Sequence, residues 1–277
     1  MREGFVWLNG RLLPASEAFI SPFDRGFLYG DGLFETLRVD EGVPCLIDRH
    51  LRRLYSSAGV IGLEHLPSPD ELKRGIEEVI EGNNWDQARM RITCSRGVDR
   101  EAKPTLFIHG RPLLQNEQHP QPVDLRVNSS VRERSPFPVR LKSLNYLPEI
   151  LAFESALEQG ASEGIFLTEE GYVAEGSISN IFCVVNGHLL TPPVSLGILP
   201  GIMREVVIEI CEREGIPVHE ERFPLQKLVE ADEVFITNAV RRVVPVGSLG
   251  GERIRGYVPG DVTMRMRQNV DSLLFNT

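Results

Sequence analysis

Two Asn-Gly dipeptides, each placed between short apolar runs, constrain the fold of this chain most strongly. The first lies in FVWLNGRLLP near the N-terminus, and the second lies in NIFCVVNGHLLTPP in the second half. Asn-Gly favours the two-residue turns that join antiparallel strands, because both residues tolerate a left-handed backbone. The sequence therefore predicts one β-hairpin around Asn9-Gly10 and another around Asn186-Gly187.

Helical patterns alternate with these strand patterns. Apolar residues recur at helical spacing over residues 48–59 and 68–81, and Ser68 can cap the second helix. Further helices are predicted over residues 147–160 and after Gly201. Strands are predicted in ARMRITCSRG, PTLFIHG, EGIFLTEEGYVAEGS and ADEVFITNAVRRVVPVGSL. Together these elements predict a two-domain α/β protein.

The segment SPFDRGFLYGDG, residues 21–32, is rich in glycine and is predicted to be a loop. Glycine allows the backbone to approach a neighbouring strand or a ligand closely. The spacing is not the GxGxxG pattern of dinucleotide-binding loops, so no dinucleotide site is predicted.

A change of composition marks the expected boundary between the two domains. Residues 113–123 are mostly polar and contain two prolines, which predicts an interdomain linker. Residues 1–112 then form a small N-terminal α+β domain, and residues 124–277 form the C-terminal domain. Each is long enough to bury a core of its own.

Composition and charge argue against several classes of function. The chain has 277 residues and a formal net charge of -9, which argues against a nucleic-acid-binding surface. The four cysteines form no CxxC pair and the six histidines show no metal-ligand spacing, so no metal site is predicted. No signal peptide or long apolar run is recognisable, and we expect a cytoplasmic protein without a membrane partner.

Lys142, in the stretch LKSLNYL, is the candidate for covalent chemistry. A lysine among apolar neighbours loses hydration of its ammonium group, which favours the neutral amine that attacks carbonyl carbons. Pyridoxal phosphate enzymes use such a lysine to hold the cofactor and then to carry protons. The same pattern also fits a half-exposed lysine that extends over a core strand.

Three further features could complete a cofactor site around Lys142. Glu175 follows a predicted strand and could pair with a pyridine nitrogen, while Arg53 could bind a phosphate through two hydrogen bonds. The turn LPGIMRE opens a helix whose free backbone N–H groups could bind the same phosphate. Taken singly, each feature also fits a solvated acid, a charge on an exposed helix face or a simple helix cap.

The whole set of motifs, in order, closely resembles the fold type IV pyridoxal phosphate family. The motifs are SPFDRGFLYGDGLFETLR, DRHLRRL, LKSLNYLPEILA, EGIFLTEEGYVAEGSISNIF, GILPGIMRE and ADEVFITNAVRRVVPV. The resemblance runs from about Val6 to Val246. The family contains branched-chain aminotransferases, D-amino acid aminotransferases and 4-amino-4-deoxychorismate lyases. It implies pyridoxal 5′-phosphate as the cofactor and a small-molecule amine as the substrate.

The resemblance also implies residue roles. Lys142 matches the Schiff-base lysine, Glu175 the partner of the pyridine nitrogen, and Arg53 the phosphate arginine. Ile202 and Met203 match the pair whose backbone N–H groups bind the phosphate, although most members have threonine where Met203 stands. The other implied positions are Tyr146, Ser179 and Asn180 at the cofactor, and Tyr29, Phe34 and Arg38 on the substrate side.

The segment Thr237-Asn238-Ala239 is the best guide to the subtype. Aminotransferases of the family usually have GTA or STT there, with a threonine hydroxyl on the phosphate. Asn238 and Ala239 also match cofactor-binding positions, but Ala239 has no hydroxyl to donate. An Asn followed by a small residue resembles the aminodeoxychorismate lyases more closely.

Positive partners are needed for the carboxylates of a substrate. Arg38, Arg91, Arg96 and Arg100 are the candidates, and each could instead be a solvated charge. D-amino acid aminotransferases have an arginine and a histidine close together in a comparable loop, whereas here no histidine follows Arg100 before His109. This departure argues against a D-amino acid substrate.

The resemblance implies an α+β N-terminal sandwich, a larger C-terminal domain with a barrel-like sheet, and a cofactor in the cleft between them, in a homodimer. The preferred hypothesis is an aminodeoxychorismate lyase of folate synthesis, which releases 4-aminobenzoate and pyruvate. The alternatives are an aminotransferase for D-amino or branched-chain amino acids, and a non-catalytic protein that binds the cofactor.

Overall fold

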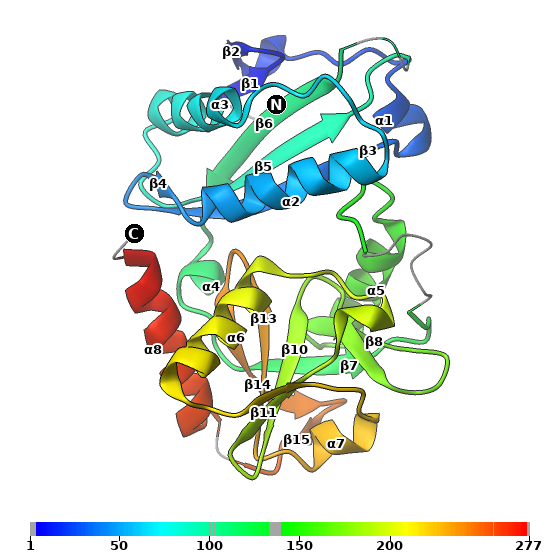
Figure 1. Ribbon diagram of the computed structural model, residues 1–277, viewed down its shortest axis with the longest axis vertical. Coiled ribbons are helices and arrows are strands. Elements are labelled where there is room, and N and C mark those ends of the chain that lie inside the picture. Colours follow the sequence, from blue (N-terminus) through cyan, green and yellow to red (C-terminus); the bar gives the residue numbers. More distant parts are fainter. Residues whose placement is uncertain (1–3, 100, 102, 133–139, 257, 276–277) are drawn as a thin grey trace. The chain divides into compact units, whose positions relative to one another are not determined.

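The computed structural model describes residues 4–99, 101, 103–132, 140–256 and 258–275 (Figure 1). The predicted α/β fold is confirmed, because helices pack on β-sheets throughout. The chain divides into two compact units. The first contains Met1–Leu114 and Leu141–Tyr146, and the second contains Gln115–Arg140 and Leu147–Thr277. The expected domain limits, 1–112 and 124–277, stay a prediction.

The first unit is built on an antiparallel sheet with six strands among the described residues, in the order β2-β1-β6-β5-β3-β4. The predicted hairpin is confirmed, since Asn9 and Gly10 join β1 to β2 with φ of 50° and 88°. The strands are β1 (Phe5–Leu8), β2 (Arg11–Pro14), β3 (Gly32–Asp40), β4 (Val43–Pro44), β5 (Ala88–Ser95) and β6 (Thr105–Pro112).

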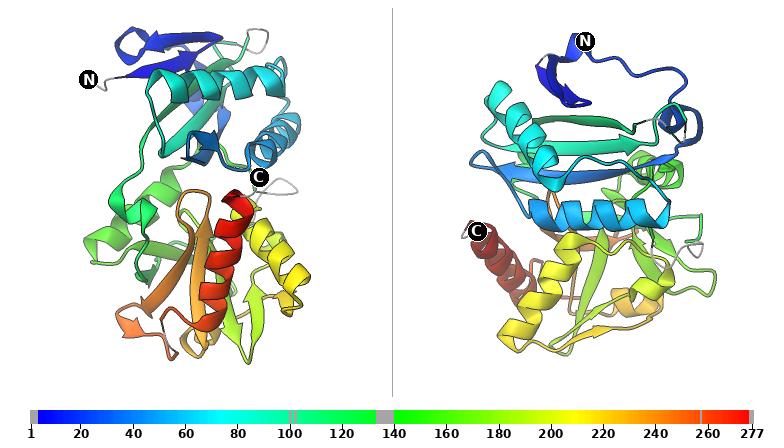
Figure 2. Two further views of the ribbon diagram at one scale, coloured as in Figure 1. Left: turned by 90° about the vertical axis from the view of Figure 1, so that its left-hand side faces the viewer. Right: turned by 45° about the horizontal axis from the view of Figure 1, so that its top comes forward.

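Two helices, α2 (Ile47–Val60) and α3 (Pro69–Gly82), cover one face of this sheet (Figures 1 and 2). Both were predicted from apolar periodicity, and Ser68 caps α3 by accepting a hydrogen bond from the amide of Glu71. The helix α3 approaches the sheet closely at Gly75, where a β-carbon would lie 2.9 Å from the ring of Trp7. Apolar residues of both helices and of β3, β5 and β6 form the core.

The prediction of a loop over residues 21–32 is wrong in part, because a short helix, α1 (Arg25–Tyr29), forms there. The carboxylate of Asp24 accepts a hydrogen bond from the amide of Gly26, and Gly30 ends the helix with φ of 66°. A 3-10 turn, η1 (Ala15–Glu17), precedes it.

The segment Leu141–Tyr146 packs on the first unit, although it is far from β3 in sequence. The amide of Phe34 donates to the carbonyl of Lys142 at 2.9 Å, and the amide of Leu144 donates to Gly32 at 3.0 Å. Lys142 is therefore fixed beside the start of β3 by backbone hydrogen bonds.

The second unit contains a curled sheet with nine strands among its described residues, ordered β12-β11-β10-β13-β14-β7-β8-β9, with β15 beside β14. The hairpin predicted at Asn186-Gly187 is confirmed. The strands are β7 (Val123–Val127), β8 (Glu163–Leu167), β9 (Val173–Gly176), β10 (Asn180–Val185), β11 (His188–Thr191), β12 (Val218–Glu220), β13 (Glu233–Asn238), β14 (Arg242–Leu249) and β15 (Glu252–Arg253).

Helices α6 (Ile202–Glu214) and α8 (Asp261–Phe275) lie side by side against β13 and β14 (Figures 1 and 2). On another part of the sheet, α5 (Leu147–Glu158) packs on β8. The α8 helix was not predicted, nor were α4 (Gln115–Gln118), α7 (Leu225–Val229) and the 3-10 turn η2 (Val194–Leu196). Among the helices of the described residues, none has both the length and the apolar character needed to cross a bilayer.

Candidate active site

Lys142 lies against aromatic rings in the first unit. Its Nζ is 4.4 Å from the ring centroid of Phe34 and 5.2 Å from that of Tyr146. These two rings meet edge to face, with centroids 5.1 Å apart. The half-buried lysine is therefore surrounded by π-faces as well as by its leucine neighbours. The structure brings together three of the predicted site residues here.

Arg91 contacts the same aromatic ring. Its guanidinium carbon is 3.7 Å from the centroid of Phe34, and its Nε donates to the hydroxyl of Thr93. Burial, together with the charge of Arg89, lowers the pKa of Arg91 to about 10. Among the described residues, no carboxylate forms an ion pair with Arg91. This half-buried cation can therefore accept an anionic ligand.

Arg53, in α2, is held by an acid of β3. This acid lies on the face of β3 that packs against α2, opposite to the face of Phe34. Glu35 is 1% exposed, and its two oxygens accept from Nε of Arg53 at 2.8 Å and Nη2 at 2.7 Å. His50 completes the cluster, with Nδ1 2.7 Å from Oε2 of Glu35. Glu35 was not selected from the sequence. Because neighbouring side chains of a strand point to opposite faces, Glu35, next to Phe34 in FETLR, lies on the face that the helices cover.

Opposing effects set the charges in this cluster. Burial acts to raise the pKa of Glu35, but Arg53 and His50 outweigh it and hold that pKa at about 2. Burial lowers the pKa of His50, against the opposite effect of Glu35. His50 is therefore neutral near pH 7, and because a carboxylate only accepts, Nδ1 carries the proton that it donates to Glu35.

The other predicted substrate-side residues lie apart from this ring cluster. Arg38 is buried, and its Nε bonds to both oxygens of Asp40 at 2.9 and 2.8 Å. Arg96 has a structural role, because it donates hydrogen bonds to Asp31 and to the carbonyls of residues 61 and 62. Tyr29 is exposed at the end of α1. Arg100 lies outside the described residues.

Glu175 is the buried acid of the second unit. It lies in β9 with 5% exposure, and its Oε2 accepts from the amide of Leu199 at 2.9 Å. Its Oε1 is 3.2 Å from Nη2 of Arg132 and 3.7 Å from Nε of Arg140. Burial raises the pKa of Glu175, although both arginines act in the opposite direction.

Ser179 and Asn180, the predicted loop residues, are held by buried partners. The hydroxyl of Ser179 donates to Oε1 of Glu163 at 2.6 Å, and Oε2 of Glu163 pairs with Arg241 at 2.8 Å. Nδ2 of Asn180 donates to the carbonyl of Leu199 at 2.9 Å. No sequence pattern pointed to Glu163, because its partners are brought to it by strand pairing.

The start of α6 offers donors suited to a phosphate. Gly201 precedes Ile202 and Met203, and no described side chain caps it. A β-carbon at Gly201 would collide with Oδ1 of Asn180, so any larger residue there would displace that side chain. Asn180 pairs with Thr237 across β10 and β13, which places both side chains on one face of the sheet.

The hydroxyl of Thr237 supplies an independent test of this fit. It is buried and has no hydrogen-bond partner among the described residues. By contrast, Oδ1 of Asn238 accepts from the amides of Val240 and Arg241, and so shapes the turn that contains Ala239. An uncapped helix start beside an unsatisfied hydroxyl fits a phosphate group.

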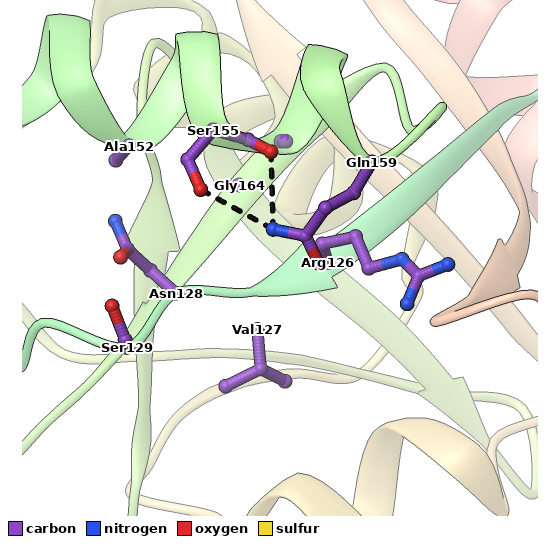
Figure 3. Close-up of a pocket in the computed structure, with 9 residues that line it drawn as sticks. Arg126, Val127, Asn128, Ser129, Ala152, Ser155, Gln159 and Gly164 are labelled. Carbon is purple, nitrogen blue, oxygen red and sulfur yellow. Dashed lines mark hydrogen bonds between the residues drawn. The ribbon is translucent and has the colours of Figure 1, made fainter.

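A separate cavity of about 360 Å³ lies between β7 and α5 (Figure 3). At one edge, Nε2 of Gln159 donates to Ser155. The guanidinium of Arg126 points away from Asn128 and Ser129, so the polar groups do not converge on one ligand (Figure 3). None of the predicted site residues lines this cavity.

Comparison with known proteins places these features in a family. A family model described as amino-transferase class IV matches residues 32–249. A putative branched-chain-amino-acid aminotransferase of Methanocaldococcus jannaschii is 36% identical, over 95% of this chain and 94% of its own. An aminodeoxychorismate lyase of Bacillus subtilis is 34% identical over 87% and 85%, and a D-alanine aminotransferase of Bacillus licheniformis is 32% identical over 98% and 96%.

Solved structures share the fold over nearly the whole chain. A branched-chain amino acid aminotransferase of Escherichia coli superposes with a TM-score of 0.89 and 30% identity, covering 99% of this chain and 95% of that one. Another branched-chain amino acid aminotransferase, solved with pyridoxamine 5′-phosphate, has a TM-score of 0.90 and 29% identity, covering 100% and 96%. The matched residues include every element that carries a candidate site residue described above.

Proposed function

The chain belongs to the class IV aminotransferase family, and from this premise we propose that it is an aminodeoxychorismate lyase. Its cofactor is pyridoxal 5′-phosphate. The proposed reaction converts 4-amino-4-deoxychorismate to 4-aminobenzoate and pyruvate in cytoplasmic folate synthesis. One observation carries the choice of a lyase. The turn after β13 has Asn238 where the resemblance gives aminotransferases a threonine, and the side chain of Asn238 bonds within the turn.

We assign the covalent attachment of the cofactor and the proton transfers to Lys142. With the cofactor bound, the amine of Lys142 would take up the proton from the amine-bearing ring carbon of the substrate. The rings of Phe34 and Tyr146 next to Nζ exclude water on that side and stabilise the ammonium that results. The bound cofactor supplies an electron sink for the pair left on that carbon. Release of the enolpyruvyl group then leaves an aromatic product.

Glu175 and the start of α6 are proposed to hold the two ends of the cofactor. The buried carboxylate of Glu175 would keep a proton on the pyridine nitrogen. The amides of Ile202 and Met203, the backbone at Asn238 and Ala239, and the guanidinium of Arg53 would bind the phosphate. To these predicted residues we add the hydroxyl of Thr237, because it is buried without a partner among the described residues. Ser179 and Asn180 position the adjoining loop.

Arg91 is the proposed partner of a substrate carboxylate. It is half-buried beside Phe34 and forms no ion pair with an acid among the described residues, whereas Arg38 already pairs with Asp40. Arg100 and Tyr29 stay predictions for the same substrate side. An Arg91→Gln variant should raise the KM at least tenfold, while Arg91→Lys, which keeps the charge, should raise it less. Equal KM values for both variants and the parent would remove Arg91 from this role.

We also propose a homodimer. The segment around α1 exposes a series of large apolar side chains, which a second copy could cover. They are Phe19, Ile20, Phe23, Phe27, Leu28 and Tyr29. Sedimentation should give twice the mass of one chain, and the double variant Phe23→Ser/Phe27→Ser should sediment as a monomer. A monomeric parent protein would overturn this proposal.

The decisive experiment is incubation of the purified yellow protein with aminodeoxychorismate. We expect equal amounts of 4-aminobenzoate and pyruvate, and none with the Lys142→Ala variant. The 36% identity with the aminotransferase of M. jannaschii favours the second candidate, an aminotransferase for branched-chain or D-amino acids. L-leucine or D-alanine would then convert the cofactor to its pyridoxamine form and release a keto acid. Cofactor binding with neither turnover would support a non-catalytic protein.

A further inference from the structure

Glu175 belongs to a cluster of four charged side chains in the second unit, three of them buried and one partly exposed. Glu175 lies in β9 and Glu149 in α5, while Arg132 and Arg140 belong to the segment between β7 and the Lys142 stretch. Side-chain exposure is 3% for Glu149, 6% for Glu175 and 4% for Arg132. Two acids and two arginines cancel in formal charge. The distribution of the contacts, and not the net charge, therefore sets the field at Glu175.

Arg132 is shared unequally between the two acids. Its Nη1 is 2.8 Å from Oε1 of Glu149, and its Nη2 is 3.2 Å from Oε1 of Glu175. The guanidinium carbon lies 3.8 Å from the ring centroid of Phe166, which limits its movement toward either acid. Arg140 also bonds to Glu149, and its Nε is 3.7 Å from Glu175. Glu149 therefore holds the closer contacts of both arginines.

We propose that Glu149 is a positioning residue that competes for Arg132 and Arg140, and so keeps Glu175 basic enough to hold a proton on the cofactor nitrogen. This inference rests on the role proposed above for Glu175. An arginine committed to Glu175 alone would weaken its attraction for that proton, and loss of Arg132 would leave a buried charge without compensation. The amide of Leu199 is the remaining group that bonds to the carboxylate.

The direction of the titration agrees with this geometry. Burial, the largest effect, raises the pKa of Glu175, while Arg132, the Leu199 amide and Arg140 lower it. Glu149 acts in the same direction as burial. The pKa of Glu149 itself is lowered, because the arginines that contact it outweigh its own burial.

The test follows the ring nitrogen itself by ¹⁵N NMR of holoenzyme loaded with ¹⁵N-labelled pyridoxal phosphate. In Glu149→Gln the shape is kept and the charge is lost, so the nitrogen should lose its proton at least about one pH unit lower, a tenfold fall in proton affinity. Glu149→Asp, which keeps the charge, should restore most of the shift. Arg140→Gln should move the midpoint upward, an opposite sign that loss of packing alone does not give.

Glu233→Gln is the matched control. Glu233 is also a buried acid of the second unit, but its oxygens accept from residues 262 and 263 at the start of α8. In this variant we expect no change in the pH at which the ring nitrogen loses its proton. Equal midpoints in Glu149→Gln and the parent would overturn the inference, as would equal shifts in the Gln and Asp variants. If Glu175→Gln leaves the titration midpoint of the ring nitrogen unchanged, the role proposed for Glu175 itself is contradicted.

Discussion

Two buried acids, Glu35 in the first unit and Glu175 in the second, are opposite cases of the same problem. Both lose their hydration, yet the pKa of Glu35 is held at about 2 and that of Glu175 is raised. Glu35 accepts hydrogen bonds from Nε and Nη2 of Arg53 and from Nδ1 of His50, whereas Glu175 shares its arginines with Glu149. The number of acids that share each arginine, and not burial alone, decides whether a buried carboxylate is a fixed charge or a proton-binding group.

Removal of the carboxylate of Glu35 should have the largest effect on the free energy of unfolding. Glu35→Gln leaves the charge of Arg53 without its bidentate partner, so the free energy of unfolding should fall by about 3–5 kcal/mol. Urea unfolding of the apoprotein measures it. Glu35→Asp, which keeps the charge on a shorter side chain, is the control and should lose less. A loss below about 1 kcal/mol would mean that the two acids do not differ as proposed.

The pH dependence of stability should separate the two acids. The pKa of Glu35 falls from an ordinary 4.5 to about 2, so its contribution is complete above about pH 4.5 and is lost as the pH falls toward 2. The contribution is on the order of 3 kcal/mol. The raised pKa of Glu175 acts oppositely, since it favours the folded state at low pH and this advantage is lost as the pH rises. Urea midpoints of the parent, Glu35→Gln and Glu175→Gln between pH 2 and 7 test both signs. Parallel curves for all three proteins would contradict the comparison.

Thr237 extends the comparison from acids to hydroxyls. In the first unit Arg53, which is proposed to bind the phosphate, donates to Glu35, while the hydroxyl of Thr237 in the second unit has no partner among the described residues. Thr237→Val should weaken the affinity for pyridoxal 5′-phosphate at least about tenfold, because a hydrogen bond to a charged group contributes about 1.5–3 kcal/mol. Unfolding of the apoprotein should change by less than about 0.5 kcal/mol. Thr237→Ser keeps the hydroxyl and should bind like the parent, in a titration of the visible absorbance. A larger effect on folding than on binding would assign Thr237 to structure.

The smallest effect is expected for Glu175→Gln in the apoprotein. Arg132 keeps Glu149 as its closer partner, and the amide oxygen of Gln can still accept from Leu199. The free energy of unfolding should therefore change by less than about 1 kcal/mol, in contrast to Glu35→Gln. Comparable losses in the two variants, measured by urea unfolding at pH 7, would remove the distinction between the acids.

Features with a local cause were predictable from the sequence. The hairpins follow from Asn-Gly turns, and the cap of α3 follows from Ser68. The short α1 was missed because its glycines favoured a loop, although Asp24 and Gly30 mark its two ends. Arg38 was predicted on the substrate side, and its pairing with Asp40, two residues along the same face of β3, was a local signal that could have been used.

Features that depend on strand pairing were not predictable. The neighbours of Lys142 in sequence are leucines, but the rings of Phe34 and Tyr146 contact its amine only because residues 141–146 pair with β3. Glu35 and Glu149 were not selected, because an isolated acid in a sequence does not identify its arginine. The family motifs selected Glu175 and Arg53 as candidates, and the coordinates show the ion pairs that each of them makes.

Leu199 is held on both sides of its Cα, since its N–H donates to Glu175 and its carbonyl accepts from Asn180. These two hydrogen bonds fix both peptide planes that meet at this Cα, and so set the span between the acid and the start of α6, three residues farther on. We expect the span to select ligands by length. Pyridoxal, which lacks the phosphate arm, would reach the acid and leave the helix end empty.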